Sequence, residues 1–212
     1  MPKNYVSNED ESARLFKSNF LEMFSHVHPT VPLAIFLPII GYFLYRGSDE
    51  ALMTPAIVVG LFFAGLFVWT LTEYLLHRFV FHYEPTSEWG KKLHFLMHGV
   101  HHDYPNDSLR LVMPPVVSLP LALLFYALFF FIMGEASTWS FFAGFLAGYL
   151  FYDMLHYATH HFAMKGAIGL WLKHHHMKHH YQTAHRNYGV SSPLWDFVFG
   201  TFLEKKEAAA NS

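Results

Sequence analysis

Four long stretches without Asp, Glu, Lys or Arg limit the folds open to this 212-residue chain. The stretch that follows Glu50 contains 22 uncharged residues, LFFAGLFVWTLT among them. At 1.5 Å per residue, a helix of that length crosses a hydrocarbon core of roughly 30 Å. The four stretches lie between Glu22 and Arg46, Glu50 and Glu73, Arg110 and Glu135, and Glu135 and Asp153. We therefore predict an all-α integral membrane protein with four transmembrane helices.

Short polar joints predict how these helices pair. The joints from Arg46 to Glu50 and from Gly134 to Thr138 are about five residues each, so the helices form two hairpins with both tips on one side. All fourteen Lys and Arg residues except Arg46 then lie on the other side. The positive-inside rule makes that side cytoplasmic, in a bacterial inner membrane or an endoplasmic reticulum. We expect a cytoplasmic helical cap there.

No repeat or linker divides the chain, which predicts one membrane-embedded domain over residues 1–212. Within it, residues 1–28 form an N-terminal interfacial segment, and residues 77–110 and 153–204 form cytoplasmic metal-binding regions. The stretch from Ser12 to Phe24 has an apolar helical face, which predicts a helix lying flat on the membrane.

Composition excludes several classes of function. Fourteen Lys and Arg against sixteen Asp and Glu give a formal charge of −2, so the chain lacks the basic surplus that nucleic-acid binding requires. The absence of cysteine excludes disulfides, thiolate metal sites and a cysteine nucleophile. Any metal site must therefore use other ligands.

Seventeen histidines are the candidates, and fifteen of them lie between His77 and His185, on the predicted cytoplasmic side. Ten of these histidines fall into four groups, and in three of the groups the members are three or four residues apart and share one face of an α-helix. The exception is the pair His77 and His82, five residues apart and about 140° out of register, so we expect the helix to unwind or end near Phe81. The groups are His77 and His82; His98, His101 and His102; His156 and His160; and His176, His179 and His180.

These ten imidazoles predict two metal ions with about five nitrogen ligands each, because a single tetrahedral zinc needs only four. Neutral imidazole binds iron, copper, nickel and zinc. Glu73 lies one turn before His77, and Asp153 lies three residues before His156. We expect each carboxylate to accept the second ring N–H of its histidine. The neighbouring histidines, expected to lie beside the ligands or in solvent, are His94, His161, His174 and His175.

The motifs HRFVFH, HGVHH, HYATH and HMKHH resemble the histidine boxes of the fatty acid hydroxylase superfamily of membrane di-metal oxygenases. The strings HFLMHGVHHDYPNDSLRLVMPP and YGVSSPLWDFVFGTFLE resemble its fatty acid 2-hydroxylase branch most closely. The resemblance covers roughly His77 to Leu203. It implies that the ten histidines bind two iron ions, which zinc can replace in purified protein, and that O2 is the cosubstrate. It further implies hydroxylation of fatty acyl chains at carbon 2, for membrane lipids such as sphingolipids, with no catalytic side chain beyond the metal ligands.

The same resemblance raises the question of electron supply. Eukaryotic relatives commonly carry a cytochrome b5 domain with a His-Pro-Gly-Gly motif, and the comparable string here is only His28-Pro29-Thr30. We therefore expect a separate donor: a cytochrome b5-like protein, a ferredoxin or a reductase. We also expect Tyr157 and Tyr181 to line the substrate entrance.

Some alternatives remain open at this point. Asp107 and Arg110 either stabilise their loop or contact a lipid headgroup. A related hydroxylase or desaturase could act on a sterol, a carotenoid or another lipid. A protein of a different class, a membrane metal-binding or transport protein without catalysis, would also need clustered histidines.

Overall fold

The computed structural model describes residues 4–51 and 53–203, and their regular structure is helical throughout. The last residue of the predicted 153–204 region lies outside these residues. Two of the elements, η1 and η2, are short π-helices. In chain order the elements are α1 (Asn19–Met23), α2 (Thr30–Asp49), α3 (Pro55–Leu76), η1 (His77–Phe81), α4 (Glu88–His94), η2 (Phe95–Gly99), α5 (Val100–Asp103), α6 (Pro115–His161), α7 (Ala167–Tyr181) and α8 (Leu194–Val198).

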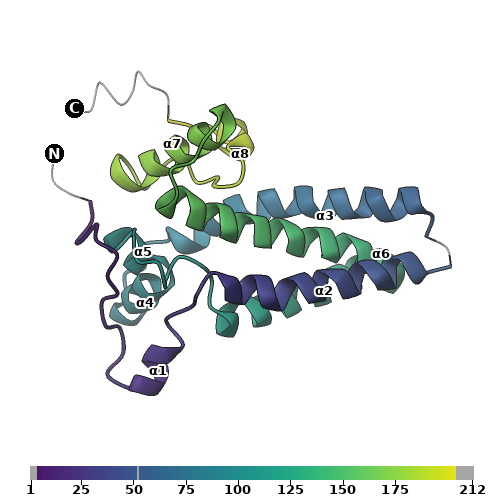
Figure 1. The fold of residues 1–212 in the computed structure, drawn as a ribbon, viewed down its shortest axis with the longest axis horizontal. Coiled ribbons are helices and arrows are strands. Elements are labelled where there is room, and N and C mark those ends of the chain that lie inside the picture. Colours follow the sequence, from purple (N-terminus) through teal and green to yellow (C-terminus); the bar gives the residue numbers. More distant parts are fainter. Residues whose placement is uncertain (1–3, 52, 204–212) are drawn as a thin grey trace.

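Three long apolar helices form a bundle (Figure 1). The three segments Thr30–Asp49, Pro55–Phe81 and Pro115–His161 are long and apolar enough to cross a membrane. Their outer surface exposes large apolar side chains, such as Phe131 at 90% and Leu123 at 67% exposure. A surface of that kind is stable in lipid rather than in water, which makes the chain an integral membrane protein.

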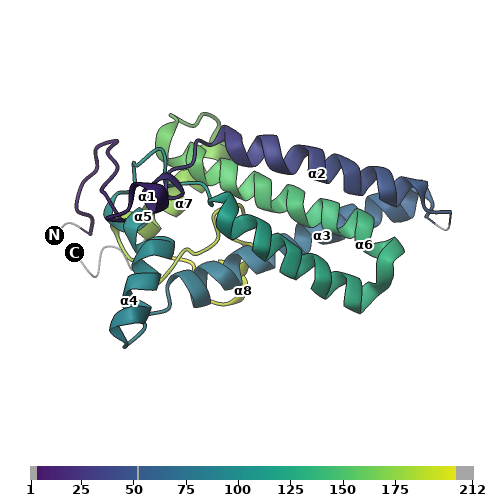
Figure 2. The same ribbon diagram turned by 90° about the horizontal axis from the view of Figure 1, so that it is seen from below.

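The third long helix, α6, consists of two arms that meet at Gly134. Gly134 has φ 76° and ψ 172°, a backbone conformation that only glycine adopts readily. The chain reverses direction at Gly134, so the arms 115–133 and 135–161 lie against one another (Figure 2). The two uncharged stretches predicted around Gly134 therefore correspond to the two arms of one kinked element.

Glycines allow α3 and α6 to pack with their backbones in contact. A Cβ atom at Gly65 would lie 1.9 Å from the carbonyl oxygen of Phe141, and one at Gly144 would lie 1.8 Å from that of Phe62. Small residues at such positions are typical of membrane helices, whose association depends on close packing. This contact places the end of α6, which carries His156 and His160, next to the end of α3, which continues into η1 and His77.

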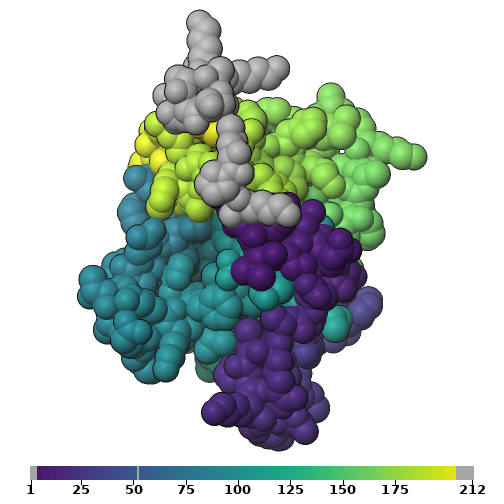
Figure 3. All heavy atoms as spheres, turned by 90° about the vertical axis from the view of Figure 1, so that its left-hand side faces the viewer, coloured from purple at the N-terminus to yellow at the C-terminus, as the bar shows by residue number. Residues whose placement is uncertain are grey.

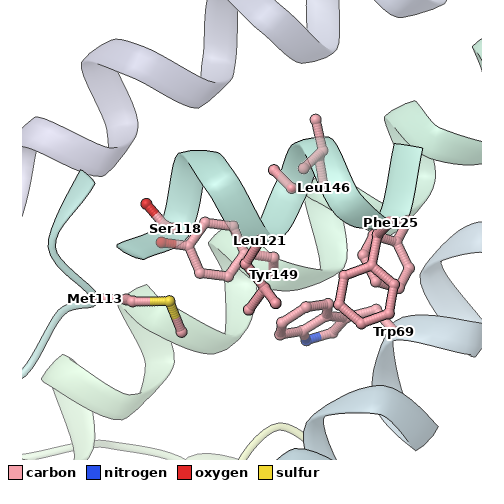
Figure 4. Close-up of a pocket in the computed structure, with 9 residues that line it drawn as sticks. Trp69, Met113, Ser118, Leu121, Phe125, Leu146 and Tyr149 are labelled. Carbon is pink, nitrogen blue, oxygen red and sulfur yellow. The ribbon is translucent and has the colours of Figure 1, made fainter. Parts of the chain in front are cut away.

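The bundle interior is filled with aromatic rings. A small pocket between α3 and the two arms of α6 has a volume of only about 20 Å³ and is lined by Trp69, Ser118, Phe125 and Tyr149, among others (Figure 4). This is space for about one water molecule. The interior around this pocket therefore leaves no room for a lipid chain.

The N-terminal segment differs from its prediction. Only Asn19–Met23 is helical, and residues 12–18 are not, because side chains take the hydrogen bonds that a helix would make. The Glu22 carboxylate accepts the backbone N–H groups of Leu15 and Phe16 at 3.0 and 2.7 Å. The predicted flat helix from Ser12 to Phe24 is therefore wrong over its first half.

The short elements α4, η2, α5, α7 and α8 gather around one end of the bundle, opposite the turn that joins α2 to α3 (Figure 1). The N-terminal segment crosses the face of this cap, between the part of the chain around residues 80–110 and α7 (Figure 3). The cap, together with η1, the residue after it and the end of α6, holds the ten predicted ligand histidines.

Candidate metal centre

The ten predicted histidines form two clusters of five. Within each cluster, one ring nitrogen of every member lies within 4.8 Å of those of the others. The clusters adjoin, because the rings of His102 and His180 stack with their centroids 4.3 Å apart. Cluster 1 contains His77, His82, His98, His102 and His179, and cluster 2 contains His101, His156, His160, His176 and His180.

A π-helical turn brings His77 and His82 together. The backbone N–H of His82 donates to the carbonyl of His77 at 3.1 Å, an i to i+5 bond that closes a wider turn than an α-helix does. The two Nε2 atoms lie 3.3 Å apart as a result. The α-helix ends at Leu76 and the π-helix at Phe81, where we expected the helix to unwind or end.

The two H-x-x-H-H motifs are divided between the clusters, contrary to our expectation that each set points together. Residues four apart stay together: the Nε2 atoms of His98 and His102 are 3.1 Å apart, as are those of His176 and His180. His101, three residues after His98, contacts His156 in cluster 2 at 2.9 Å. His179 contacts His82 in cluster 1, also at 2.9 Å. Each motif thus spans both clusters.

Burial keeps these rings uncharged. Desolvation, followed by the neighbouring rings, lowers the pKa of His98, His101, His176 and His180 well below the ordinary value of histidine. The same burial lowers the pKa of His102 to about 3. Neutral imidazole is the form that binds a metal ion, so the donor set fits two metal ions.

The clusters differ in how the second ring nitrogens are used. In cluster 1, His77 Nδ1 donates to the Tyr188 carbonyl at 2.5 Å, and His179 Nδ1 donates to the Arg186 carbonyl at 2.7 Å. Each Nε2 therefore carries the lone pair that faces the cluster. In cluster 2, the Nδ1 atoms of all five histidines are buried without a hydrogen-bond partner in the described structure.

Glu73 and Asp153 are buried, but their partners differ from those expected. Glu73 Oε1 accepts the backbone N–H groups of Val190 and Ser191 at 2.6 and 2.8 Å, and the Ser191 hydroxyl donates to Oε2. The ring of His77 instead donates to Tyr188, two residues before Val190. Glu73 thus supports cluster 1 through the loop and not through the imidazole.

Asp153 binds the segment just before α6 and a tyrosine of its own helix rather than a histidine. Its Oδ1 accepts the backbone N–H of Met113 at 3.1 Å, and its Oδ2 accepts the Tyr149 hydroxyl at 3.3 Å. The neighbouring ring of His156 leaves its Nδ1 unpaired. The expected carboxylate-histidine pair is therefore absent here.

Sequence reasoning missed the pair that connects the C-terminal loop to α7. Buried His175 donates from Nε2 to Asp196 Oδ2 at 3.0 Å. The same carboxylate accepts the backbone N–H groups of Tyr188 and Gly189. Asp196 therefore positions the loop whose carbonyl binds His77. The PLWD string was the available signal, because it places an acid among aromatic residues.

A largely apolar cavity of about 530 Å³ reaches both clusters. Its wall includes His98 of cluster 1 and His101 and His156 of cluster 2. The rest comes from the N-terminal segment, the end of α3, η1, α4, η2, α5, the loop between α5 and α6, and both arms of α6. Apolar residues on this wall include Leu15, Leu21, Phe24, Val80, Leu96, Met97 and Val116.

A second, more polar cavity of about 240 Å³ touches the clusters elsewhere. It is lined by His82, His98 and His102 of cluster 1 and by His180 of cluster 2. Glu84, His94 and His185 also line it. The histidine clusters therefore adjoin an apolar cavity and a polar one.

Tyr157 and Tyr181 do not line the apolar cavity. Tyr157 stacks on His161 with ring centroids 4.6 Å apart, and the Tyr181 hydroxyl donates to Asn8 Oδ1 at 2.7 Å. Tyr181 thus contacts the N-terminal segment. The place of both tyrosines at the substrate entrance stays a prediction.

Known proteins are similar to this chain in sequence and in fold. Residues 62–201 match the fatty acid hydroxylase family. The dihydroceramide fatty acyl 2-hydroxylase FAH2 of Arabidopsis thaliana is 38% identical over 95% of this chain and 85% of that protein. The ceramide very long chain fatty acid hydroxylase SCS7 of Saccharomyces cerevisiae is 40% identical over 95% of this chain and 52% of that protein. A solved structure described as full-length scs7p, with only its hydroxylase domain visible, superposes with a TM-score of 0.83 at 39% identity, over 88% of this chain and 70% of that one.

Fold and site together define a helical membrane protein with two adjoining histidine clusters. The chain belongs to the fatty acid hydroxylase family.

Proposed function

We propose that this chain hydroxylates fatty acyl chains at carbon 2, producing 2-hydroxylated membrane lipids such as sphingolipids. The observation that carries the proposal is the contact between the apolar cavity of about 530 Å³ and both five-histidine clusters. The names of the plant and yeast relatives, which describe acyl hydroxylases of ceramides and dihydroceramides, support the same reaction and substrate class.

The ten histidines of clusters 1 and 2 are the proposed ligands of two iron ions. Each cluster consists of histidines alone, and neutral imidazoles suit iron, although zinc binds such sets too. Iron supplies the redox chemistry that side chains lack: O2, two electrons and two protons convert a C–H bond to C–OH and release water. The protein's own part is to orient the imidazoles, through the carbonyls of Tyr188 and Arg186 in cluster 1.

The apolar cavity is the proposed acyl site. Its volume lies in the range of small-molecule sites, and its wall comes from segments that meet only in the folded chain. Packing of methylene groups against side chains such as Leu96 and Val116 excludes water from the substrate. The chain then presents its carbon 2 to the rings of His98, His101 and His156.

The proposal includes a separate electron donor, a cytochrome b5-like protein, a ferredoxin or a reductase. It also places the cap on the cytoplasmic face and makes each arm of α6 a membrane span. The distribution of lysine and arginine, which leaves only Arg46 at the hairpin tips, supports this orientation in a bacterial inner membrane or an endoplasmic reticulum.

Expression in a host that makes no 2-hydroxy fatty acids tests the function. With iron and a competent donor present, lipid analysis should find 2-hydroxy acyl chains. Hydroxylated or desaturated sterols or carotenoids without 2-hydroxy acyl chains would assign the chain to another lipid. Bound metal with no oxidised lipid would indicate a metal-binding or transport protein.

A further inference from the structure

Arg110 introduces a positive charge into the wall of the apolar cavity. It lies in the loop between α5 and α6, and its side chain is only 4% exposed. Among the described residues that line the cavity, it is the one lysine or arginine. The same wall includes His98, His101 and His156, so Arg110 and the metal centre adjoin one continuous space.

The two terminal nitrogens of Arg110 are already paired. Nη1 donates to Asp107 Oδ2 at 3.2 Å, and Nη2 donates to Glu22 Oε1 at 2.7 Å. Nη2 also lies 3.3 Å from Ser25 Oγ and 2.9 Å from His26 Nε2. These contacts attach the N-terminal segment to the cap and fix the plane of the guanidinium.

The third nitrogen, Nε, is buried and has no hydrogen-bond partner in the described structure. Native structures rarely leave a buried donor on a charged group unpaired, because its desolvation is not compensated. Hydrogen bonds from a guanidinium to oxygen acceptors are among the stronger ones in proteins. An oxygen atom of a ligand in the cavity would complete the set.

Position-specific oxidation requires such a contact. The methylene groups of an acyl chain are alike, so an apolar wall alone lets the chain slide and selects no carbon. We propose that Arg110 Nε–H donates a hydrogen bond to an oxygen in the polar end of the acyl lipid, either the acyl carbonyl or a headgroup hydroxyl. This contact determines which carbon faces the histidines, and the inference rests on the proposed acyl substrate.

Binding to the metal-loaded protein in lipid nanodiscs tests the contact without turnover. Three probes separate the two oxygen sources: a ceramide, its N-alkyl counterpart without the carbonyl, and its counterpart without a headgroup hydroxyl. The wild type should bind the probe that lacks the hydrogen-bonded oxygen roughly 10- to 100-fold more weakly than the ceramide. An effect of that size is expected for a hydrogen bond to a charged group. Arg110→Lys keeps the charge beside Asp107 and Glu22 but lacks Nε–H, so it should bind all three probes alike.

Glu22→Gln is the matched control, because it breaks the ion pair with Nη2 and leaves Nε intact. It should lower the unfolding temperature while preserving the wild-type discrimination. Equal binding of all three probes to the wild type would overturn the proposal. The proposal would also be overturned if Arg110→Lys still distinguished the three probes. The same holds if Glu22→Gln lost this discrimination to the same extent as Arg110→Lys.

A measurement on the wild type alone covers the case in which Arg110→Lys does not fold. Isotope-edited infrared spectra of probes labelled at the carbonyl or at the hydroxyl should show one of these groups shifted by hydrogen bonding on binding. Spectra with neither group shifted would contradict the inference. Discriminating binding without any 2-hydroxy product would contradict the proposed function and leave this inference standing.

Discussion

The two histidine clusters have the same number and kind of ligands but different surroundings. Cluster 1 provides three of the four cluster histidines that line the polar cavity, namely His82, His98 and His102. Cluster 2 provides two of the three that line the apolar cavity, His101 and His156. Two rings of cluster 1 bind backbone carbonyls, whereas the five Nδ1 atoms of cluster 2 have no partner in the described structure.

This difference separates two tasks. Cluster 2 adjoins the proposed acyl chain, where a dry wall protects the reacting carbon. Cluster 1 adjoins the polar cavity, and carbonyls of the C-terminal loop orient two of its rings, His77 and His179. Because each H-x-x-H-H motif contributes to both clusters, a shift of α5 or α7 would move both metal positions together. The predictions below test this division.

The largest expected effect comes from removing one ligand of either cluster. His179→Ala in cluster 1 and His101→Ala in cluster 2 should each lower 2-hydroxy product roughly 1000-fold or more, because the ligands act as a unit. Metal analysis should show loss of about one of the two metal ions in each variant. His174→Ala, at an exposed position on α7, should retain wild-type product. Full activity in either ligand variant would refute the assignment.

Replacing Glu73, the carboxylate that supports the C-terminal loop, should affect metal binding at cluster 1 only. Glu73→Gln weakens the contact with Val190 and Ser191 and thereby the carbonyl that orients His77. Metal affinity of cluster 1 should fall roughly 10- to 100-fold, as for other partners of metal ligands, while that of cluster 2 stays the same. Metal titration followed by spectroscopy measures both. An equal fall at both clusters would show that the loop does not serve cluster 1 specifically.

Filling the apolar cavity should weaken binding of the acyl substrate and leave metal binding unchanged. Val80 and its neighbour Phe79 are both exposed, and of the two only Val80 lines the cavity. Val80→Trp should lower kcat/KM roughly tenfold, mostly through KM, because a few carbon atoms in a substrate pocket have effects of that size. Phe79→Trp is the matched control and should behave like the wild type. Equal effects of the two substitutions would place the substrate elsewhere.

The smallest effects are expected at the two tyrosines first assigned to the entrance. Tyr157→Phe and Tyr181→Phe each remove one hydroxyl outside the apolar cavity, so product formation should stay within about twofold of the wild type. Lipid analysis of expressing cells is sufficient to measure this. A tenfold loss in either variant would restore the original assignment.

Residue spacing predicted which histidines gather, and the structure shows why it could not predict their division. Helical periodicity pairs His98 with His102 and His176 with His180, and these pairs do stay together. His101 and His179 project from the same helices toward rings of other elements. That choice depends on tertiary packing, which the local pattern does not contain. The pairing of His77 with His82 likewise depends on a π-helical turn.

The cavity and its polar groups were harder to predict, because they form from distant segments. Leu15, Val80 and Val116 meet on one wall although a membrane segment or the cap separates them in the chain. The carboxylates show a related limit. Glu73 and Asp153 lie one turn from histidines, yet they bind backbone N–H groups of a loop and of a helix start. Proximity along a helix therefore did not indicate their partners.

Oxygen-isotope labelling of the product tests the central claim most directly. Purified, iron-loaded protein in lipid nanodiscs, supplied with an electron donor and an acyl lipid, is incubated under ¹⁸O2. The wild type should form 2-hydroxy acyl product whose new hydroxyl oxygen is ¹⁸O, and His101→Ala and His179→Ala should not form it. Product with oxygen derived from water, or hydroxylation that persists in both variants, would contradict it.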